Sequence, residues 1–230
     1  MRKFFGIVLI GGFLFYVASL IGSTVLPGSA SEKGSVGSVI LAQFAEETVS
    51  ANAVTSVVVS YRGFDTLGEV TVLFLSALSL SLLFSGGIHK EKLLGKRNFI
   101  FENGLKVVAP FIFLFGAYVV VHGHLSPGGG FPGGVIIATG VFAMLFTGSL
   151  HVSKSLFSVI EGLSGLTFVV LGILGLVSGH SFLYNFMPKG TLGSLLSAGI
   201  IPVIYAVVGV KVAAELTGLT ANSLYYEQED

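Results

Sequence analysis

Cysteine is absent from this chain, and its absence excludes several classes of site. Without a thiol there is no disulfide, no thiolate-bound zinc and no iron–sulfur cluster held by cysteine. Any redox chemistry that accompanies the protein must therefore sit on partner subunits, and the chain itself is expected to hold no cofactor.

Charge is also scarce. Charged residues make up 10% of the 230 residues, against roughly 25% in soluble domains. Hydrophobic residues make up 53%, and the mean hydropathy is +0.90. The formal net charge is +0, which gives no indication of a nucleic-acid partner. This composition predicts an all-α integral membrane protein.

Six apolar runs have about the 20 residues that a bilayer-spanning helix requires. The runs cover residues 4–22, 67–86, 105–123, 132–150, 155–178 and 195–217. The first run follows Arg2 and Lys3, as in a signal peptide, but no small-residue cleavage site follows it soon enough. We therefore expect an uncleaved first helix and a multi-pass protein of the cell membrane.

The basic residues orient these spans. With six spans, one side carries Arg2, Lys3, Lys90, Lys92, Lys96, Arg97, Lys106, Lys154 and Lys211. The other side carries Lys33, Arg62 and Lys189. By the positive-inside rule, both termini are predicted to be cytoplasmic.

A cytoplasmic basic joint, residues 91–104, separates a two-span region (1–90) from a four-span region (105–217), and a cytoplasmic tail (218–230) follows. Within the first region, residues 36–61 carry apolar positions at mixed helical spacing. We interpret them as an amphipathic helix on the outer surface or against a partner, with an ordinary packed loop helix as an equal alternative.

The first polar candidates lie at the start of the second span. Asp65 and Glu69 are four residues apart, so a helix places both carboxylates on one face. Asp65, or Thr66 beside it, is well placed to cap the helix, which is a structural role. Glu69 lies about one turn deeper, where a carboxylate is a candidate for a proton or Na⁺ relay that binds Na⁺ transiently. A simple interhelical hydrogen bond is the alternative.

The second candidate is a loop between two apolar runs, with the sequence HGHLSPGGGFPGG from His122 to Gly134. Irregular backbone at a membrane boundary needs surrounding protein or a wet cavity. His122 and His124 are too close in sequence to bind one metal from a helix, so they are either proton carriers or hydrogen-bond donors to loop carbonyls. No phosphate-loop lysine follows the glycines, which excludes nucleotide binding.

The loop glycines are expected to permit close helix packing or a positive φ, and Pro132 suits the first turn of the next helix. Small residues in the fifth span follow the pattern Gly172-x-x-Gly175-x-x-x-Gly179. This pattern predicts tight helix–helix contacts in lipid.

The third set of candidates comprises Glu161, Lys211 and Glu215. Lys211 and Glu215 have i,i+4 spacing, which favours a structural salt bridge. Glu161 lies inside the fifth span and is a candidate for the ion path, paired with Lys211 or with another subunit. Lys211 is kept as a candidate for the same path.

These residues carry a resemblance to known families. The loop from His122 to Gly134 and the closing segment Gly209-Val-Lys-Val-Ala-Ala-Glu-Leu216 resemble the MnhB protein of Mrp-type (Mnh-type) Na⁺/H⁺ antiporters, over residues 105–217. Residues 1–86, through Asn52-Ala-Val and Arg62-Gly-Phe-Asp-Thr-Leu-Gly-Glu69, resemble the C-terminal end of the large antiporter protein MnhA. They resemble the small MbhE protein of membrane-bound hydrogenases equally.

The resemblance implies a non-catalytic membrane subunit of a complex related to complex I, in which Glu69 belongs to the cation path. The fused arrangement resembles that of ferredoxin-driven respiratory complexes, the membrane-bound hydrogenase or its sulfane-sulfur-reducing relative. The implied partners are A-, C-, D-, E-, F- and G-like antiporter proteins in the membrane and a hydrogenase-like peripheral arm. Iron–sulfur clusters and a NiFe centre would belong to that arm.

Three alternatives differ from this interpretation. The chain could be a subunit of a stand-alone Mrp antiporter, or a structural scaffold that seals partner subunits without touching ions. A self-contained transporter or enzyme would need several convergent polar groups around a substrate cavity. The sequence offers few of these.

Overall fold

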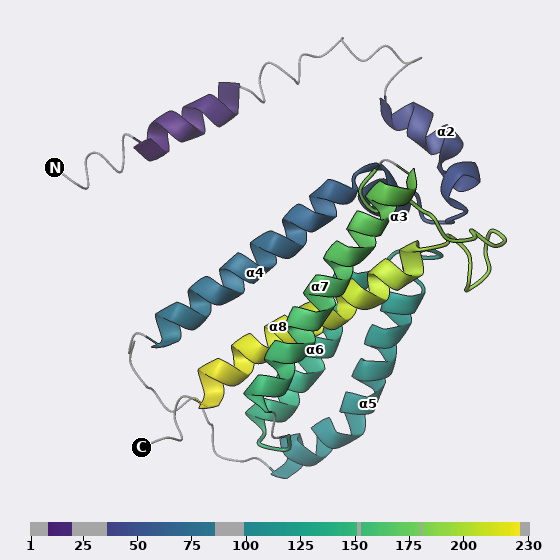
Figure 1. Cartoon of the computed structure of the whole chain (residues 1–230). Helices are drawn as coiled ribbons and strands as arrows, with labels where there is room; N and C mark the ends of the chain where they lie inside the picture. The colour runs from purple at the N-terminus through teal and green to yellow at the C-terminus, as the bar shows by residue number, and fades with distance from the viewer. Residues whose placement is uncertain (1–8, 20–35, 86–98, 151–152, 180, 226–230) are drawn as a thin grey trace. The chain divides into compact units, whose positions relative to one another are not determined.

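The computed structural model describes residues 9–19, 36–85, 99–150, 153–179 and 181–225 (Figure 1). Within these ranges every regular element is a helix, so the all-α prediction holds for the described residues. The chain forms two compact units, residues 1–42 and 43–230. The second contains all the candidate residues, whereas the predicted basic joint falls largely outside the described residues.

Four helices are long and apolar enough to cross a membrane. These are α4 (Gly63–Ser85), α5 (Phe99–Val121), α7 (Lys154–Gly179) and α8 (Ile201–Tyr225). Two further apolar helices, Leu9–Ser19 and α6 (Gly130–Phe146), are shorter. Each lies within or close to a predicted span, so the protein crosses the membrane several times, while the number six and the orientation stay predictions.

Helix α8 is central to the second compact region. It packs against α4, α5, α6 and α7, and 50% of its most apolar window is buried, against 11–22% in the other spanning helices. Side chains along it, including Ile204, Val208 and Val212, form the main core with Phe168 of α7. A charge at one of the buried positions of α8 is therefore shielded from lipid.

Glycine brings α6 against its neighbours. A Cβ on Gly134 would lie 2.7 Å from the Gly209 carbonyl oxygen of α8, and one on Gly133 would lie 2.8 Å from the Gly116 oxygen of α5. Gly129, just before the helix, has φ +132°, which L side chains rarely adopt. Pro132 lies in the first turn. The predicted roles of these residues are confirmed.

The amphipathic interpretation required one helix over residues 36–61, but the structure has a break within this region. Helix α2 (Val36–Thr48) ends where Val49 adopts φ +54°. After the break, Asn52 caps the short helix α3 (Ala53–Thr55), which continues into a π-helix, η1 (Ser56–Tyr61). The Asn52 side chain accepts hydrogen bonds from two backbone N–H groups, those of Val54 and Thr55, and this fixes the new start.

The last span also begins later than predicted. Ala198 and Gly199 adopt φ of +66° and +60°, so residues 195–200 are irregular and α8 starts at Ile201. The Asn185 amide holds this turn by donating to the Ala198 oxygen and accepting from the Ile200 N–H, both at 3.0 Å. At its other end α8 runs to Tyr225, into the predicted tail.

The glycines of α7 pack against a loop and not against another helix. Cβ atoms on Gly172 and Gly179 would meet the rings of Phe182 and Tyr184, and one on Gly175 would meet the Tyr184 backbone nitrogen at 2.5 Å. The prediction of a close contact is confirmed, but the helix partner was wrong. The chain folds back at once after α7, and a folded-back loop gives the same sequence pattern.

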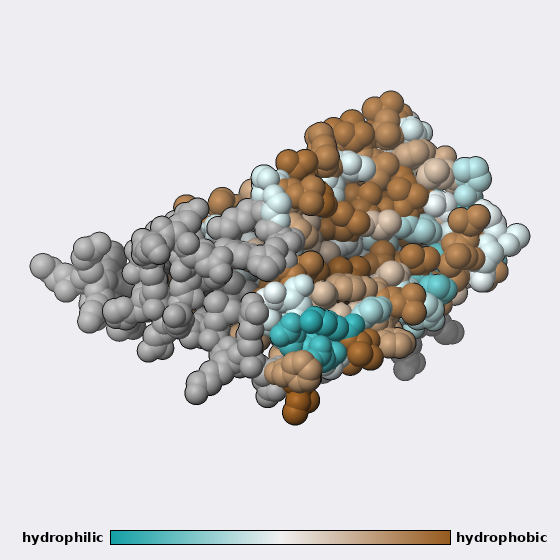
Figure 2. All heavy atoms as spheres, turned by 90° about the horizontal axis from the view of Figure 1, so that it is seen from below, coloured by the Kyte–Doolittle hydropathy of each residue, from teal (hydrophilic) through white to brown (hydrophobic). Residues whose placement is uncertain are grey.

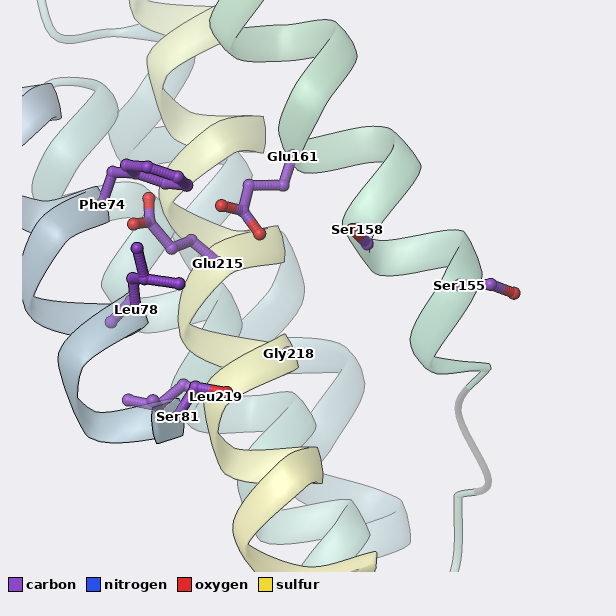
Figure 3. A pocket seen from close by; sticks show the side chains of 10 residues that line it. Phe74, Leu78, Ser81, Ser155, Ser158, Glu161, Glu215, Gly218 and Leu219 are labelled. Carbon is purple, nitrogen blue, oxygen red and sulfur yellow. The ribbon is translucent and has the colours of Figure 1, made fainter. Parts of the chain in front are cut away.

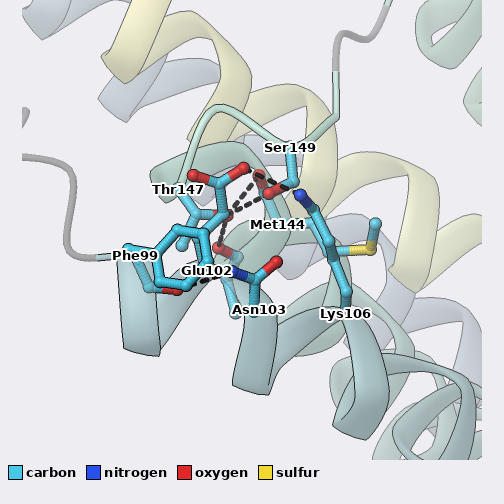
Figure 4. Close-up of polar contacts among 8 residues, drawn as sticks. Phe99, Glu102, Asn103, Lys106, Met144, Thr147 and Ser149 are labelled. Atoms are coloured by element: carbon cyan, nitrogen blue, oxygen red, sulfur yellow. Dashed lines mark hydrogen bonds and ion pairs between the residues drawn. The ribbon is translucent and has the colours of Figure 1, made fainter.

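The outer surface of the helices is apolar. Phe111, Leu114 and Phe115 of α5 are 57–70% exposed, and Figure 2 shows apolar residues over much of the visible described surface. Polar contacts gather where α5 begins and α6 ends (Figure 4). There Lys106 pairs with Glu102 at 2.9 Å. This distribution is the one expected of helices that face lipid or other apolar subunits.

Candidate functional site

Asp65 and Glu69 both lie on α4 with exposed side chains. Helix α4 starts at Gly63, so Asp65 is in the first turn and not at the N-cap position. It pairs with Arg62. Thr66 does not cap the helix either, because its hydroxyl donates to the Val58 carbonyl oxygen at 2.7 Å. Glu69 lies one turn deeper than Asp65, as the spacing predicted.

A short segment from the first family-like region, Ser50–Thr55, binds the histidine loop. The carbonyl oxygen of His124 accepts hydrogen bonds from the Ser50 hydroxyl at 2.8 Å and the Ala51 N–H at 3.0 Å. The Asn52 amide donates to the carbonyl oxygens of Gly123 and Ser126, both at 2.9 Å. These contacts satisfy the irregular backbone that the sequence places at a membrane boundary.

The two histidines have different surroundings. His124 is 0% exposed, its Nε2 lies 3.4 Å from the Ser194 carbonyl oxygen, and its Nδ1 has no partner among the described atoms. Burial lowers the pKa of His124 below the ordinary value of 6.5. His122 is half-buried and stacks on Tyr118 with ring centroids 4.1 Å apart. Contact with loop carbonyls favours the structural alternative, and proton transfer stays a prediction.

A third polar group surrounds Glu47. Tyr61 donates a hydrogen bond to its carboxylate, and Lys189 donates to its backbone oxygen. Burial and then the Glu47 carboxylate raise the pKa of Tyr61 to about 12, so the phenol stays protonated as the donor. A cavity of about 240 Å³ adjoins these residues. No local pattern in the sequence signals this group, because its members come from three separate segments.

Lys211 and Glu215 form a buried ion pair in α8, as predicted. The Lys211 Nζ lies 2.6 Å from the Glu215 Oε2, and the two side chains are only 6% and 1% exposed. The ammonium group also lies 5.6 Å from the ring centroid of Phe74 in α4. On the α7 side, Gly165 leaves room for the lysine stem, since a Cβ there would lie 3.5 Å from the Lys211 Cε. The pair therefore lies between α4 and α7.

Glu161 of α7 faces the same place. Its carboxylate interacts electrostatically with both Glu215 and Lys211. A cavity of about 450 Å³ is lined by residues that include Glu161, Glu215, Phe74, Ser81 and Ser158. Figure 3 shows the Glu161 side chain reaching from α7 towards the space that Glu215 also faces. Of the predicted site residues, the structure thus brings together Glu161 and Lys211.

The sequence predicts Glu215 only as a structural partner for Lys211. Its second oxygen, Oε1, is buried and has no hydrogen-bond partner among the described atoms. A carboxylate four residues from a lysine on one helix signals a salt bridge, but the sequence carries no signal for a free second oxygen. Within the described residues, no group of three or more His, Asp or Glu side chains could hold a metal ion.

Known protein families match two parts of the chain. A family model described as a domain related to the MnhB subunit of Na⁺/H⁺ antiporter matches residues 100–218, and the MbhE model, which describes a subunit of MBH, matches residues 15–85. An uncharacterized protein of Methanocaldococcus jannaschii is 29% identical over 198 residues, covering 72% of this chain and 74% of that protein. The B component of the Na⁺/H⁺ antiporter of Bacillus subtilis is 34% identical over 88 residues, covering 36% and 62%.

Two solved structures are similar over nearly the whole chain. One chain of the membrane-bound sulfane sulfur reductase, an archaeal respiratory membrane complex, is 38% identical with a TM-score of 0.75, covering 97% of this chain and 98% of that one. A chain of the Mrp complex from Dietzia sp. has a TM-score of 0.73 at 23% identity; all of this chain matches 27% of that one, which shows a shared fold. The MbhE-like region precedes the MnhB-related domain in the same chain. The protein is a multi-pass membrane protein that belongs to the family related to the MnhB subunit of Na⁺/H⁺ antiporters.

Proposed function

We propose that this chain is a non-catalytic membrane subunit of a respiratory complex, where it contributes to Na⁺/H⁺ translocation coupled to ferredoxin-driven redox chemistry on other subunits. The parent complex would be a sulfane-sulfur-reducing complex or a membrane-bound hydrogenase. The match to one whole chain of the sulfane sulfur reductase, at 98% coverage of that chain, supports the first of these. The Mrp chain is matched over only 27% of its length, so a stand-alone antiporter is less well supported.

The observation that carries the proposal is the exposed carboxylate of Glu69 on a spanning helix. A carboxylate facing lipid costs about 2.5–3.5 kcal/mol at the centre of a helix, so such groups face protein or water. Since Glu69 lies on the outside of this chain, a polar surface of a neighbouring subunit would cover it. A carboxylate at a subunit interface within the membrane is suited to exchange Na⁺ and H⁺.

The rest of the proposed assembly is supported by the similarity to chains of multisubunit membrane complexes. A-, C-, D-, E-, F- and G-like antiporter proteins would surround the chain in the membrane, and a hydrogenase-like arm would carry the iron–sulfur clusters and a NiFe centre. This chain has no cysteine to hold a cluster. His122 and His124 would serve the path only indirectly, by holding backbone in place, whereas Asp65 pairs with the exposed Arg62 and has no part in it.

Replacing one carboxylate tests the relay. In the complex reconstituted in vesicles, Glu69→Gln is expected to lower Na⁺-dependent transport at least about tenfold, because the amide cannot exchange a proton. Asp65→Asn is the matched control. It removes an exposed carboxylate one turn away on α4, and transport is expected to stay near the wild-type rate.

The alternative outcome is equally definite. A Glu69→Gln complex that is intact and transports at the wild-type rate contradicts the relay, and it favours a scaffold that seals its partners without handling ions. The protein composition of both variant complexes, measured on the same preparation, separates lost transport from lost assembly.

A further inference from the structure

The cavity between α4, α7 and α8 holds more negative than positive charge. Glu161 and Glu215 face it with two carboxylates, and Lys211 supplies one ammonium group. The described lining residues of α4 add Phe74, Ala77, Leu78 and Ser81, none of which carries a charge. With both carboxylates ionised, one negative charge stays unbalanced among apolar helices, where an uncompensated charge is costly.

The position of that charge is defined by the ion pair. Lys211 occupies the Glu215 Oε2 at 2.6 Å and is itself held against the Phe74 ring. The Glu215 Oε1 is left without a partner among the described atoms, although the residue is only 2% exposed. A buried carboxylate oxygen normally accepts a hydrogen bond or contacts a cation, so this one lacks a ligand.

The second carboxylate belongs to the same space. Glu161 is half-buried, and none of the described hydrogen bonds or ion pairs involves its carboxylate. It lies on the same face of α7 as Gly165, four residues along, where an added Cβ would lie 3.5 Å from the Lys211 Cε. Ser81 of α4 and Ser158 of α7 also line the cavity. Oxygen, supplied here by the two carboxylates, is the ligand that hard cations prefer.

We propose that Glu161 and Glu215 form a site for one exchangeable monovalent cation, either H⁺ or Na⁺, with Lys211 as the fixed counter-charge. A volume of about 450 Å³ leaves room for water and a small ion between the two carboxylates. The Lys211 ammonium group balances one of the two carboxylate charges, so one further positive charge neutralises the site. The site therefore binds and releases one cation.

The site is separate from Glu69. Glu161 and Glu215 face a cavity inside this chain, whereas Glu69 is exposed on its outer side. Cation binding at this site can be tested by itself, without measuring transport. A complex whose Glu69 variant loses transport can still keep this site, and the reverse also holds.

Infrared titration of the purified complex provides the test, because a protonated carboxylic acid has its own C=O band. In the wild type we expect a band that titrates with pH and disappears in Glu161→Gln. The control Glu46→Gln, an exposed carboxylate outside the spanning helices, is expected to keep the band. Glu161→Asp, which keeps the charge but shortens the side chain, should shift the midpoint and so covers a failure of the glutamine variant to fold.

The same titration in NaCl and in choline chloride distinguishes the two cations. If Na⁺ competes with H⁺, the midpoint falls by up to about one pH unit for each tenfold rise in NaCl and stays fixed in choline chloride, as linkage requires. A midpoint that ignores Na⁺ assigns the exchangeable charge to H⁺. A spectrum with no titrating band that depends on Glu161, in either salt, overturns the proposal.

Discussion

His124 is the residue whose burial has the clearest consequence for stability. Its folded pKa is lowered by burial, while an unfolded chain has the ordinary value of 6.5. The unfolded state therefore takes up a proton first as the pH falls. The stabilisation is complete above the unfolded pKa and is lost as the pH drops through it, with a slope of at most about 1.4 kcal/mol per pH unit.

Thermal unfolding of the purified chain should show this loss between about pH 7.5 and about pH 5.5. The His124→Asn variant, which cannot be protonated, is expected to be less stable at the higher pH and to change less between the two. His122→Asn is the control, because His122 is half-buried and keeps contact with solvent. Equal pH dependence in wild type and His124→Asn contradicts the assignment.

At the scale of elements, the approach of α6 to α8 depends on a glycine contact. A methyl group on Gly134 would lie 2.7 Å from the Gly209 oxygen and 2.8 Å from the Val212 Cβ, both on α8. Since neither backbone nor a β-branched carbon can move aside easily, Gly134→Ala should destabilise the chain by about 1–3 kcal/mol. The measurement is the unfolding midpoint in detergent.

Gly162→Ala is the matched control for this contact. Gly162 lies inside α7, and a Cβ there would meet nothing within 4 Å. Alanine also favours the helix by up to about 1 kcal/mol over glycine, so this variant should be neutral or slightly more stable. If both substitutions had the same effect, helix propensity and not close approach would explain the glycine at position 134.

At the scale of the whole molecule, the proposed assembly would cover the exposed Glu69 and part of the exposed apolar surface with other subunits. Purification of the tagged chain in mild detergent should bring down antiporter-like membrane proteins together with iron–sulfur proteins. Mass spectrometry of the eluate identifies them. Antiporter proteins alone would indicate a stand-alone Na⁺/H⁺ exchanger, and a chain that elutes alone and stable would contradict both assemblies.

Membrane insertion and helical class are determined by the sequence itself, because hydropathy depends on composition along a run and not on contacts. The glycines and the proline at the start of α6 were equally informative. A side chain at position 133 or 134 would clash with the neighbouring helix, so only glycine fits there. Gly129 adopts a φ of +132°, which L side chains rarely adopt. The i,i+4 spacing likewise predicted the Lys211–Glu215 pair, since helix geometry alone brings these side chains together.

Tertiary contacts decided the features that depend on distant segments. The break at Val49 and the binding of Ser50–Thr55 to the histidine loop join residues more than 60 positions apart, so no local pattern signals them. The late start of α8 depends on the Asn185 amide in the preceding loop. The cavity that unites Glu161 with Glu215 exists only where α4, α7 and α8 meet. Periodicity along one helix defines which face a residue is on, but only the packing of helices decides what that face meets.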